Sequence, residues 1–492
     1  MTIDESAVAS TFGLTTEFKD LRVGRAALLP QRIALVGQGS TSKSYSLDKW
    51  SATSAGAVGA RYGYGSPLHL AMLQLKPANG DGVGTVPVDI LPLEDAYEGA
   101  PSSGTITPTG TQTKAASVRV LVNKIPSGRF TVNPADSMAT VCDKIVAAIN
   151  GVLEMPVIAT DGTTNVGLES KWAGESANGI YVELEAEALG VTYAVVQPTG
   201  GLVNPSIDAA LLKIGASSWV TMILNCLNVS DTDALDALSD LGEGRWNPLV
   251  RKPFIAFVGN TEAVVGTATT VSAARSTDRV NAQLVAPGSK NLPFVVAARQ
   301  LARIAKVANN TPAKSYQKQQ ATGLTPGTDE EQWDYDARDL AVKAGSSTVE
   351  IVDGLIKIAD VVTFYRPTGE DPPGYRYVVT IVKLQNCIYN FNLEFEKEEW
   401  ASAALVTDAD VTVSEVARRP KDWVAKANQI LQSLGNEAII SDVAGAQDKT
   451  DARINGSNPN RLDLDVEFPV SGNANIQNMT QSFGFLFGEA AA

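Results

Sequence analysis

Short runs of consecutive apolar residues recur along the chain, and helical patterns alternate with them. Ile33–Val36 leads into a Gly-rich turn and then a helix predicted over Ser66–Lys76, whose Ser-Pro start is a typical N-cap and N1 pair. Val220–Leu224 and Pro253–Val258 repeat the strand pattern, and Leu292–Val307 has the spacing of a long helix. This order of strand, loop and helix predicts an α/β unit.

Composition sets broad limits on what this chain does. Its 492 residues allow roughly three domains. With 44% apolar and 19% charged residues, the chain is not mainly disordered. The 40 Lys and Arg against 54 Asp and Glu give a net charge of −14, which argues against direct nucleic-acid binding. No apolar run approaches the ~20 residues of a membrane helix. We expect no membrane insertion and, since no signal peptide is visible, synthesis in a cytosol.

A second kind of pattern lies between the α/β segments. Residues 98–117 are rich in Gly, Ser, Thr and Pro, which predicts a linker or long loop. Beyond them, 118–122 and 129–132 have strand patterns, and a helix follows Asp136-Ser137. Residues 93–202 are therefore predicted to form an inserted β-rich outer domain.

Strand patterns dominate from about residue 350. Strands are predicted over 375–383 and 391–395, a helix over Trp423–Leu434, and a half-buried strand over Leu462–Phe468. Phenylalanines recur at every second position near the C-terminus, and a chain end this apolar must dock on something. Its candidate anchors are Ile476, Met479, Phe483, Phe485, Leu486 and Phe487.

The predicted fold class is a multidomain α+β and α/β protein with a mixed-sheet core, terminal arms and the inserted β-rich domain. A discontinuous middle α/β domain covers 26–92 and 203–350, and a C-terminal core domain covers 351–470. Residues 1–25 form an N-terminal arm and residues 471–492 a C-terminal arm. Such arms are suited to adding strands to the sheets of other chains.

Side chains for catalysis are scarce. The chain has one histidine, His69, which argues against Ser-His-Asp, Cys-His and multi-His zinc chemistry. Cys142, Cys226 and Cys387 lack metal-ligand spacing, and we expect them to be buried free thiols. Disulfides between subunits are the alternative for these cysteines. No catalytic residue, metal or cofactor is predicted.

Residues 37–44 nearly match a phosphate-binding loop. The segment follows an apolar strand and ends in Lys43-Ser44, but Ser42 stands where the motif requires glycine. No Walker-B strand is evident. An ordinary polar turn is the favoured interpretation, and a nucleotide-binding enzyme is a remote alternative.

The helix predicted over 292–307 carries a basic stripe of Arg299, Arg303 and Lys306 on its expected outer face. Such a stripe is usually solvated. It is also a candidate for charge pairing between subunits, since an acidic run with Asp329-Glu330-Glu331 lies downstream.

Five stretches in a shared order resemble the contractile tail sheath proteins of Mu-like phages. They are Leu29-Pro30 with Ile33 to Gln38 and Ala60 to Leu68; Ala147 to Asn150, Met155 to Val157 and Gly174 to Ile180; Gly200-Gly201 with Asn204-Pro205 and Arg245 to Pro248; Val361 to Tyr365; and Ile388 to Phe395. The family keeps a turn at 37–44 without needing the lysine.

The resemblance implies a structural subunit and no enzyme. Six copies would form a ring, and rings would stack around an inner tail tube, which contraction drives through the host envelope. It implies baseplate and tail terminator proteins as partners, and a place in a virion tail assembled in the host bacterial cytoplasm. A headless, tailocin-like injection particle would use the same subunit. A carbohydrate-binding surface protein is a further alternative, although the insertion has no aromatic platform.

Overall fold

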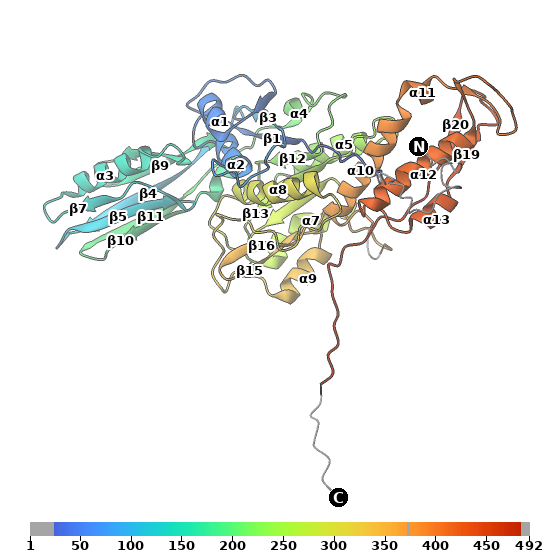
Figure 1. The fold of residues 1–492 in the computed structure, drawn as a ribbon. Helices are drawn as coiled ribbons and strands as arrows, with labels where there is room; N and C mark the ends of the chain where they lie inside the picture. The colour runs from blue at the N-terminus through green and yellow to red at the C-terminus, as the bar shows by residue number, and fades with distance from the viewer. Residues whose placement is uncertain (1–23, 371–373, 484–492) are drawn as a thin grey trace, which may run out of the picture. The chain divides into compact units, whose positions relative to one another are not determined.

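The computed structural model describes residues 24–370 and 374–483, which divide into two compact units (Figure 1). The large unit comprises residues 28–385 and the segment that begins at Gly472. The small unit comprises residues 386–471 and the residues leading to Ala27. The five-part domain division predicted above stays a prediction.

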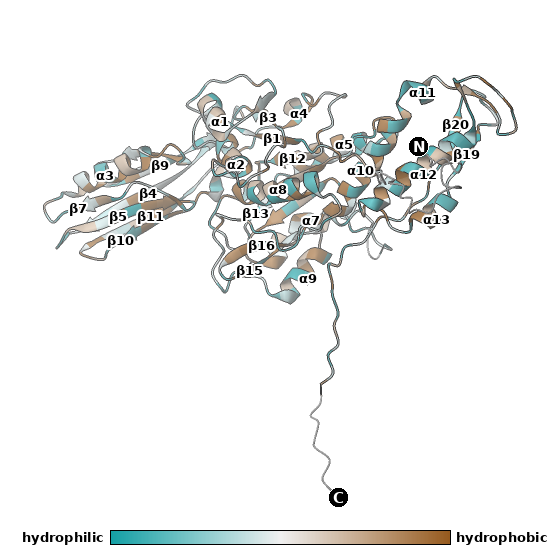
Figure 2. Ribbon diagram, in the orientation of Figure 1, coloured by the Kyte–Doolittle hydropathy of each residue, from teal (hydrophilic) through white to brown (hydrophobic). Residues whose placement is uncertain are grey.

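A six-stranded sheet organises the large unit, in the strand order β14-β13-β12-β1-β3-β2. All neighbouring strands are parallel except β2, which runs antiparallel to β3. The strands are β1 (Ile33–Gln38), β2 (Trp50–Ala52), β3 (Val88–Leu93), β12 (Met222–Asn225), β13 (Ile255–Asn260) and β14 (Asn281–Val285). Parallel strands are buried on both faces, which explains their consecutive apolar residues; β13 is largely apolar in Figure 2.

Helices cover both faces of this sheet. Alternate residues of β1 enter different cores: Ile33 and Leu35 pack with one group of helices, Ala34 and Val36 with another. The first group includes α2 (Pro67–Leu75) and α8 (Pro293–Asn310), and the second α4 (Asp208–Leu211) and α5 (Thr232–Trp246). The α/β unit and its two predicted helices are confirmed, including the Ser66 N-cap of α2.

The remaining elements around the sheet are short. A β-hairpin and four small helices complete this part of the large unit. They are α1 (Ala55–Tyr62), α6 (Val265–Ala268), α7 (Thr270–Ala274), α9 (Tyr335–Lys343), β15 (Thr348–Val352) and β16 (Leu355–Asp360).

Residues 101–199 form two four-stranded sheets with one long helix. One sheet has the order β11-β4-β9-β8; in the other, β5 pairs with β10, β6 and β7. The elements are β4 (Pro101–Gly110), β5 (Ala116–Val122), β6 (Ile125–Pro126), β7 (Phe130–Val132), α3 (Met138–Asn150), β8 (Val157–Asp161), β9 (Val166–Ala173), the 3₁₀ helix η2 (Glu175–Gly179), β10 (Val182–Ala186) and β11 (Val191–Thr199). The side-chain amide of Gln197 links β11 to β10 by hydrogen bonds to both backbone groups of Val182, each 2.8 Å long.

The linker predicted over 98–117 is wrong, because β4 and the start of β5 occupy most of it. Burial alternates along β4, with Ser102, Gly104 and Ile106 facing inwards. Because Ser102 and Gly104 are small, the sequence of this strand lacks the alternation of large apolar and polar residues that predicts a strand. β4 pairs with β9 only as far as Ile106, so Pro108 lies where β4 is an edge, which is where a strand tolerates proline.

The small unit is mainly helical and carries short strand pairs. Its longest helix packs against a hairpin through apolar residues that include Leu431 and Leu434. The elements are α11 (Glu398–Ala401), β17 (Ala404–Leu405), β18 (Ala417–Arg418), α12 (Pro420–Asn436), α13 (Val443–Asp448), β19 (Asp451–Ile454) and β20 (Leu462–Asp465).

The strands predicted over 375–383 and 391–395 are also wrong. Val378–Phe395 is one helix, α10. Its start, Val378-Val379-Thr380-Ile381-Val382, is β-branched almost throughout, which favours a strand. Short apolar runs do not separate strand from buried helix, and tertiary packing overrides the modest helix penalty of β-branched residues. The mixed α+β fold class remains confirmed.

The end of β13 lies too close to α8 for any side chain. A Cβ on Gly259 would sit 1.8 Å from the carbonyl oxygen of Pro293. We predict that Gly259→Ala lowers the unfolding free energy by about 1 to 3 kcal/mol, the usual cost of overpacking. Gly266→Ala is the control, because a Cβ there has no neighbour within 4 Å. Equal stability of the two variants in urea denaturation would contradict this packing.

Candidate functional site

Several of the backbone donors in the turn at 37–44 are already bonded within the chain. The backbone N–H groups of three successive residues donate within the chain: Gly39 to the Tyr45 hydroxyl at 3.0 Å, Ser40 to the Tyr62 carbonyl at 2.7 Å, and Thr41 to the Lys171 carbonyl at 2.8 Å. No helix begins at Lys43, whereas a phosphate loop opens one.

Lys43 is also engaged, since its Nζ donates to the carbonyl oxygen of Ala60. The favoured sequence interpretation of an ordinary polar turn therefore agrees with the geometry, and the nucleotide-binding alternative finds no support in it.

His69 is a structural residue. Its Nδ1 accepts a hydrogen bond of 3.1 Å from the N–H of Gly65, which leaves the ring proton on Nε2. The side chain is buried and its ring packs edge-on against Tyr64. Burial, aided by the charge of Lys171, lowers the pKa of His69 to about 4. The ring is thus neutral at physiological pH.

The three cysteines are free and buried in the described structure. Burial raises the pKa of the Cys142 and Cys226 thiols and raises that of Cys387 to about 12. Such thiols are inert towards exchange. The prediction of buried free thiols agrees with this arrangement, which offers no exposed sulfur for a disulfide between subunits.

The prediction that all three residues of the basic stripe lie on the outer face of their helix is wrong. Arg299 is only 3% exposed, and its guanidinium binds the Asp81 carboxylate at 2.5 Å. Arg303 binds the same carboxylate at 2.5 Å. Hydrogen bonds from both arginines, that of Arg303 foremost, lower the pKa of Asp81 to about 2. Of the three stripe residues, Lys306 alone is exposed.

The sequence gives no indication that Asp81 pairs with these arginines, because it lies in a loop more than 200 residues away from both. The pairing holds that loop against α8. A role of the stripe between subunits stays a prediction.

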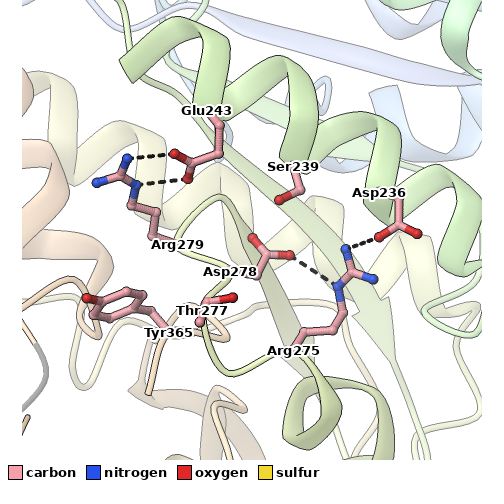
Figure 3. A pocket seen from close by; sticks show the side chains of 8 residues that line it. All are labelled: Asp236, Ser239, Glu243, Arg275, Thr277, Asp278, Arg279 and Tyr365. Carbon is pink, nitrogen blue, oxygen red and sulfur yellow. Dashed lines mark hydrogen bonds and ion pairs between the residues drawn. The ribbon is translucent and has the colours of Figure 1, made fainter. Parts of the chain in front are cut away.

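A hollow of about 530 Å³ lies between α5 and residues 275–279 (Figure 3). Arg279 makes two bonds to the Glu243 carboxylate, of 2.6 and 2.9 Å. Arg275 bridges Asp236 at 2.6 Å and Asp278 at 3.2 Å. Both guanidiniums are thus occupied by carboxylates of the chain itself. The hollow is held by ion pairs and presents no unpaired cation to an anionic ligand.

The C-terminal segment, in contrast to the hollow with its paired charges, exposes apolar side chains. From Gly472 to Phe483 the described chain forms neither helix nor strand. Three large apolar side chains stand in solvent there: Ile476 is 82% exposed, Met479 75% and Phe483 91%. Phe485, Leu486 and Phe487 lie outside the described residues. From here on, the C-terminal arm means residues 476–492, which is narrower than the 471–492 predicted from the sequence because Asn473 and Asn475 bond to other residues of the large unit. The described part of this arm carries exposed apolar side chains.

The hairpin β19–β20 is a two-stranded sheet. The strands pair antiparallel from Asp451↔Asp465 to Ile454↔Leu462, and within the described residues neither strand has a second neighbour. α12 packs against the hairpin. Two-stranded sheets are marginal in water, and each unpaired edge offers hydrogen bonds to a further strand.

Residues 24–370 and 374–483 contain neither a metal-binding cluster nor a membrane-spanning helix. No group of three His, Cys, Asp or Glu side chains there is placed to hold a metal ion. None of the helices described is long and apolar enough to cross a membrane.

Comparisons with known proteins found similar proteins by sequence and by structure. No family model matches the chain. The Mu-like prophage FluMu tail sheath protein of Haemophilus influenzae is 28% identical over 341 residues, covering 67% of each chain. The sheath tail protein Lin1278 of Listeria innocua aligns in structure at 11% identity, over 92% of this chain and 94% of its own, with a TM-score of 0.47. A chain of the anti-feeding prophage baseplate in its contracted state aligns at 10% identity, over 97% and 100%, with a TM-score of 0.49.

The described part of the chain combines exposed apolar side chains near its C-terminus with polar groups that bond within the chain. The sequence comparison finds a Mu-like tail sheath protein as a relative of this chain, in agreement with the resemblance of its motifs.

The Asp81 pairing yields a first prediction. Asp81→Asn would leave Arg299 buried without its countercharge, and we expect a loss of roughly 2 to 4 kcal/mol in unfolding free energy, below the fully buried case because Asp81 is partly exposed. Asp339→Asn breaks the exposed pair with Lys343 and is expected to cost less than about 0.5 kcal/mol. Guanidinium denaturation at pH 7 measures both. Similar losses would show that the Asp81 pair is an ordinary surface contact.

His69 gives a further testable prediction, on the pH dependence of stability. Its folded-state pKa of about 4 lies below the ordinary value of 6.5, so the unfolded chain binds the proton first as pH falls. Stability is lost from about pH 6.5 down to pH 4. Between pH 7 and 5 this loss is about 2 kcal/mol. In His69→Asn, whose amide oxygen replaces Nδ1 as acceptor, the difference between the two pH values should shrink by that amount. An unchanged difference would place the titration elsewhere.

Proposed function

We propose that this chain is the subunit of a contractile tail sheath, and that it acts by assembling with copies of itself. The observation that carries the proposal is the C-terminal arm. It ends the chain with apolar side chains that are exposed where described, in a protein related to a Mu-like tail sheath protein. A folded protein rarely leaves such anchors in water unless a partner covers them.

The energetics explain why the anchors must be apolar. Ordering a free strand costs about 1 to 2 kcal/mol per residue. Each backbone hydrogen bond returns about 0.5 to 1.5 kcal/mol, so pairing alone roughly breaks even. Full burial of each large apolar side chain adds about 1.5 to 3 kcal/mol. The favourable net binding therefore comes from Ile476, Met479, Phe483 and the apolar residues after them.

The hairpin β19–β20 is the acceptor that fits this arm. Its two edges accept backbone hydrogen bonds, and strand addition is a common way to extend a short sheet. The solvent-facing side of β19 carries Asp451 and Arg453, and such charges discourage nonspecific strand pairing between molecules. An arm from one copy completes the sheet of the next, and the N-terminal arm, residues 1–25, is proposed to act in the same way.

The lattice follows from such links. Six copies form a ring, and rings stack around an inner tail tube between the baseplate and the terminator. Assembly takes place in the host bacterial cytoplasm, and the finished sheath belongs to the tail of the particle. Contraction repacks rigid units while the arms keep neighbours joined. The extended lattice is a kinetically trapped state, so its energy is stored during assembly and no cofactor is needed.

The arm gives a direct prediction. Deleting residues 476–492 should leave a folded monomer that forms no tubes or rings, because the linking strand is gone. Sedimentation and negative-stain imaging of purified protein measure assembly, and circular dichroism checks the fold.

A matched pair of variants separates apolar burial from arm length. Replacing Ile476, Met479 and Phe483 with serine should abolish tubes, whereas Gln477→Ser with Asn478→Ser should preserve them. Normal tubes from the apolar triple variant would refute the proposed role of the arm.

A further inference from the structure

Lys383 is the only lysine that is fully buried among the described residues. It lies on α10, and its Nζ donates to the side-chain oxygen of Asn473 at 2.8 Å. Burial lowers the pKa of Lys383 to about 8. An apolar residue would fill this position at lower cost, since burying an ammonium group is unfavourable. The cost of burying this lysine is offset by its polar contacts, which include the bond to Asn473.

Asn473 is the last residue before the C-terminal arm that is held at both ends of its side chain. While its oxygen accepts from Lys383, its Nδ2 donates to the carbonyl of Ala313 at 2.9 Å. Two residues later the Ser315 hydroxyl approaches the Asn475 side-chain oxygen at 3.4 Å. Beyond this point the arm is exposed, beginning with Ile476. The fixed part of the chain thus ends at these contacts.

The small unit contains a similar arrangement at the other end of the chain. The Asn390 side chain accepts from the N–H of Ala27 at 2.9 Å and donates to its carbonyl at 2.8 Å. Asn436 donates to the carbonyl of Gly24 at 3.0 Å. Residues before Gly24 lie outside the described structure. Near each terminus, therefore, side-chain amides hold the segment where the predicted arm meets the folded chain.

We propose that Lys383, Asn473 and the Ala313 carbonyl form an anchor that sets where the C-terminal arm leaves its own molecule. Lys383 and Asn473 are then positioning residues for the link between copies. The inference rests on the proposed function, because it assumes that the arm joins another copy.

A fixed starting point matters for a strand that is tethered to one molecule and binds another. The concentration of the arm at a neighbour's sheet depends on where the tether begins and how freely it moves. Releasing Asn473 lets the tether begin further back and sample more directions, which dilutes the arm at its acceptor without touching any contact that the arm makes.

The test compares Lys383→Met and Asn473→Ala with Lys318→Met, a control in which the side chain is 72% exposed. Nitroxide labels on Ala474→Cys and Asn310→Cys, both at exposed positions, report the arm root in the monomer. The three native thiols are buried and do not compete for label. We expect a narrow distance distribution in the parent and control chains and a broad one in both anchor variants.

Assembly is measured in parallel as the critical concentration for tube formation. It should rise about tenfold or more in the anchor variants and stay unchanged in the control. Asn473→Ala should have an effect at least as large as that of Lys383→Met, because it also removes the bond to the Ala313 carbonyl. Should Lys383→Met fail to fold, Asn473→Ala alone decides.

The outcomes separate the two proposals. An unchanged distance distribution, or an unchanged critical concentration despite a broad distribution, overturns the anchor while leaving the sheath function intact. Failure of the parent chain to form tubes overturns the sheath function instead.

Discussion

A strand that leaves its own molecule must recover the entropy of its ordering from the chain it joins, and this constraint explains the character of the C-terminus. Backbone pairing alone roughly balances that entropy, so apolar side chains have to supply the rest. In the arm these apolar side chains are exposed to solvent, at Ile476, Met479 and Phe483. Elsewhere the chain commits its strongest polar groups to itself, as at Asp81 and Arg279. These exposed side chains are what the proposed function, association with copies of the same chain, would use.

Sequence patterns predicted the elements in which side-chain period and burial agree. β1 and β13 are continuous apolar runs because parallel strands are covered on both faces, and α8 shows a clean helical stripe. The failures have a shared physical cause. In β4 Ile106 is the one large aliphatic residue among the buried positions, so no apolar alternation marks the strand. In α10 the β-branched residues suit a strand as well as a buried helix.

The candidate site was predictable only in part. The aromatic C-terminus and the motif resemblance are local features, readable in order along the chain. The pairing of Asp81 with Arg299 joins residues far apart in sequence, and only the fold brings them together. Lys383 was missed for the same reason, because only the fold brings it to Asn473, about 90 residues further along the chain. Local patterns carry no information on such partners.

Electron cryomicroscopy of tubes assembled from the full chain tests the central claim most directly, because it traces each terminus to its acceptor. The account predicts that the C-terminal arm lies as an added strand beside β19 or β20 of a different copy, with its phenylalanines covered. Both termini folded back onto their own molecule, with every β19–β20 hairpin completed by its own chain, would contradict it.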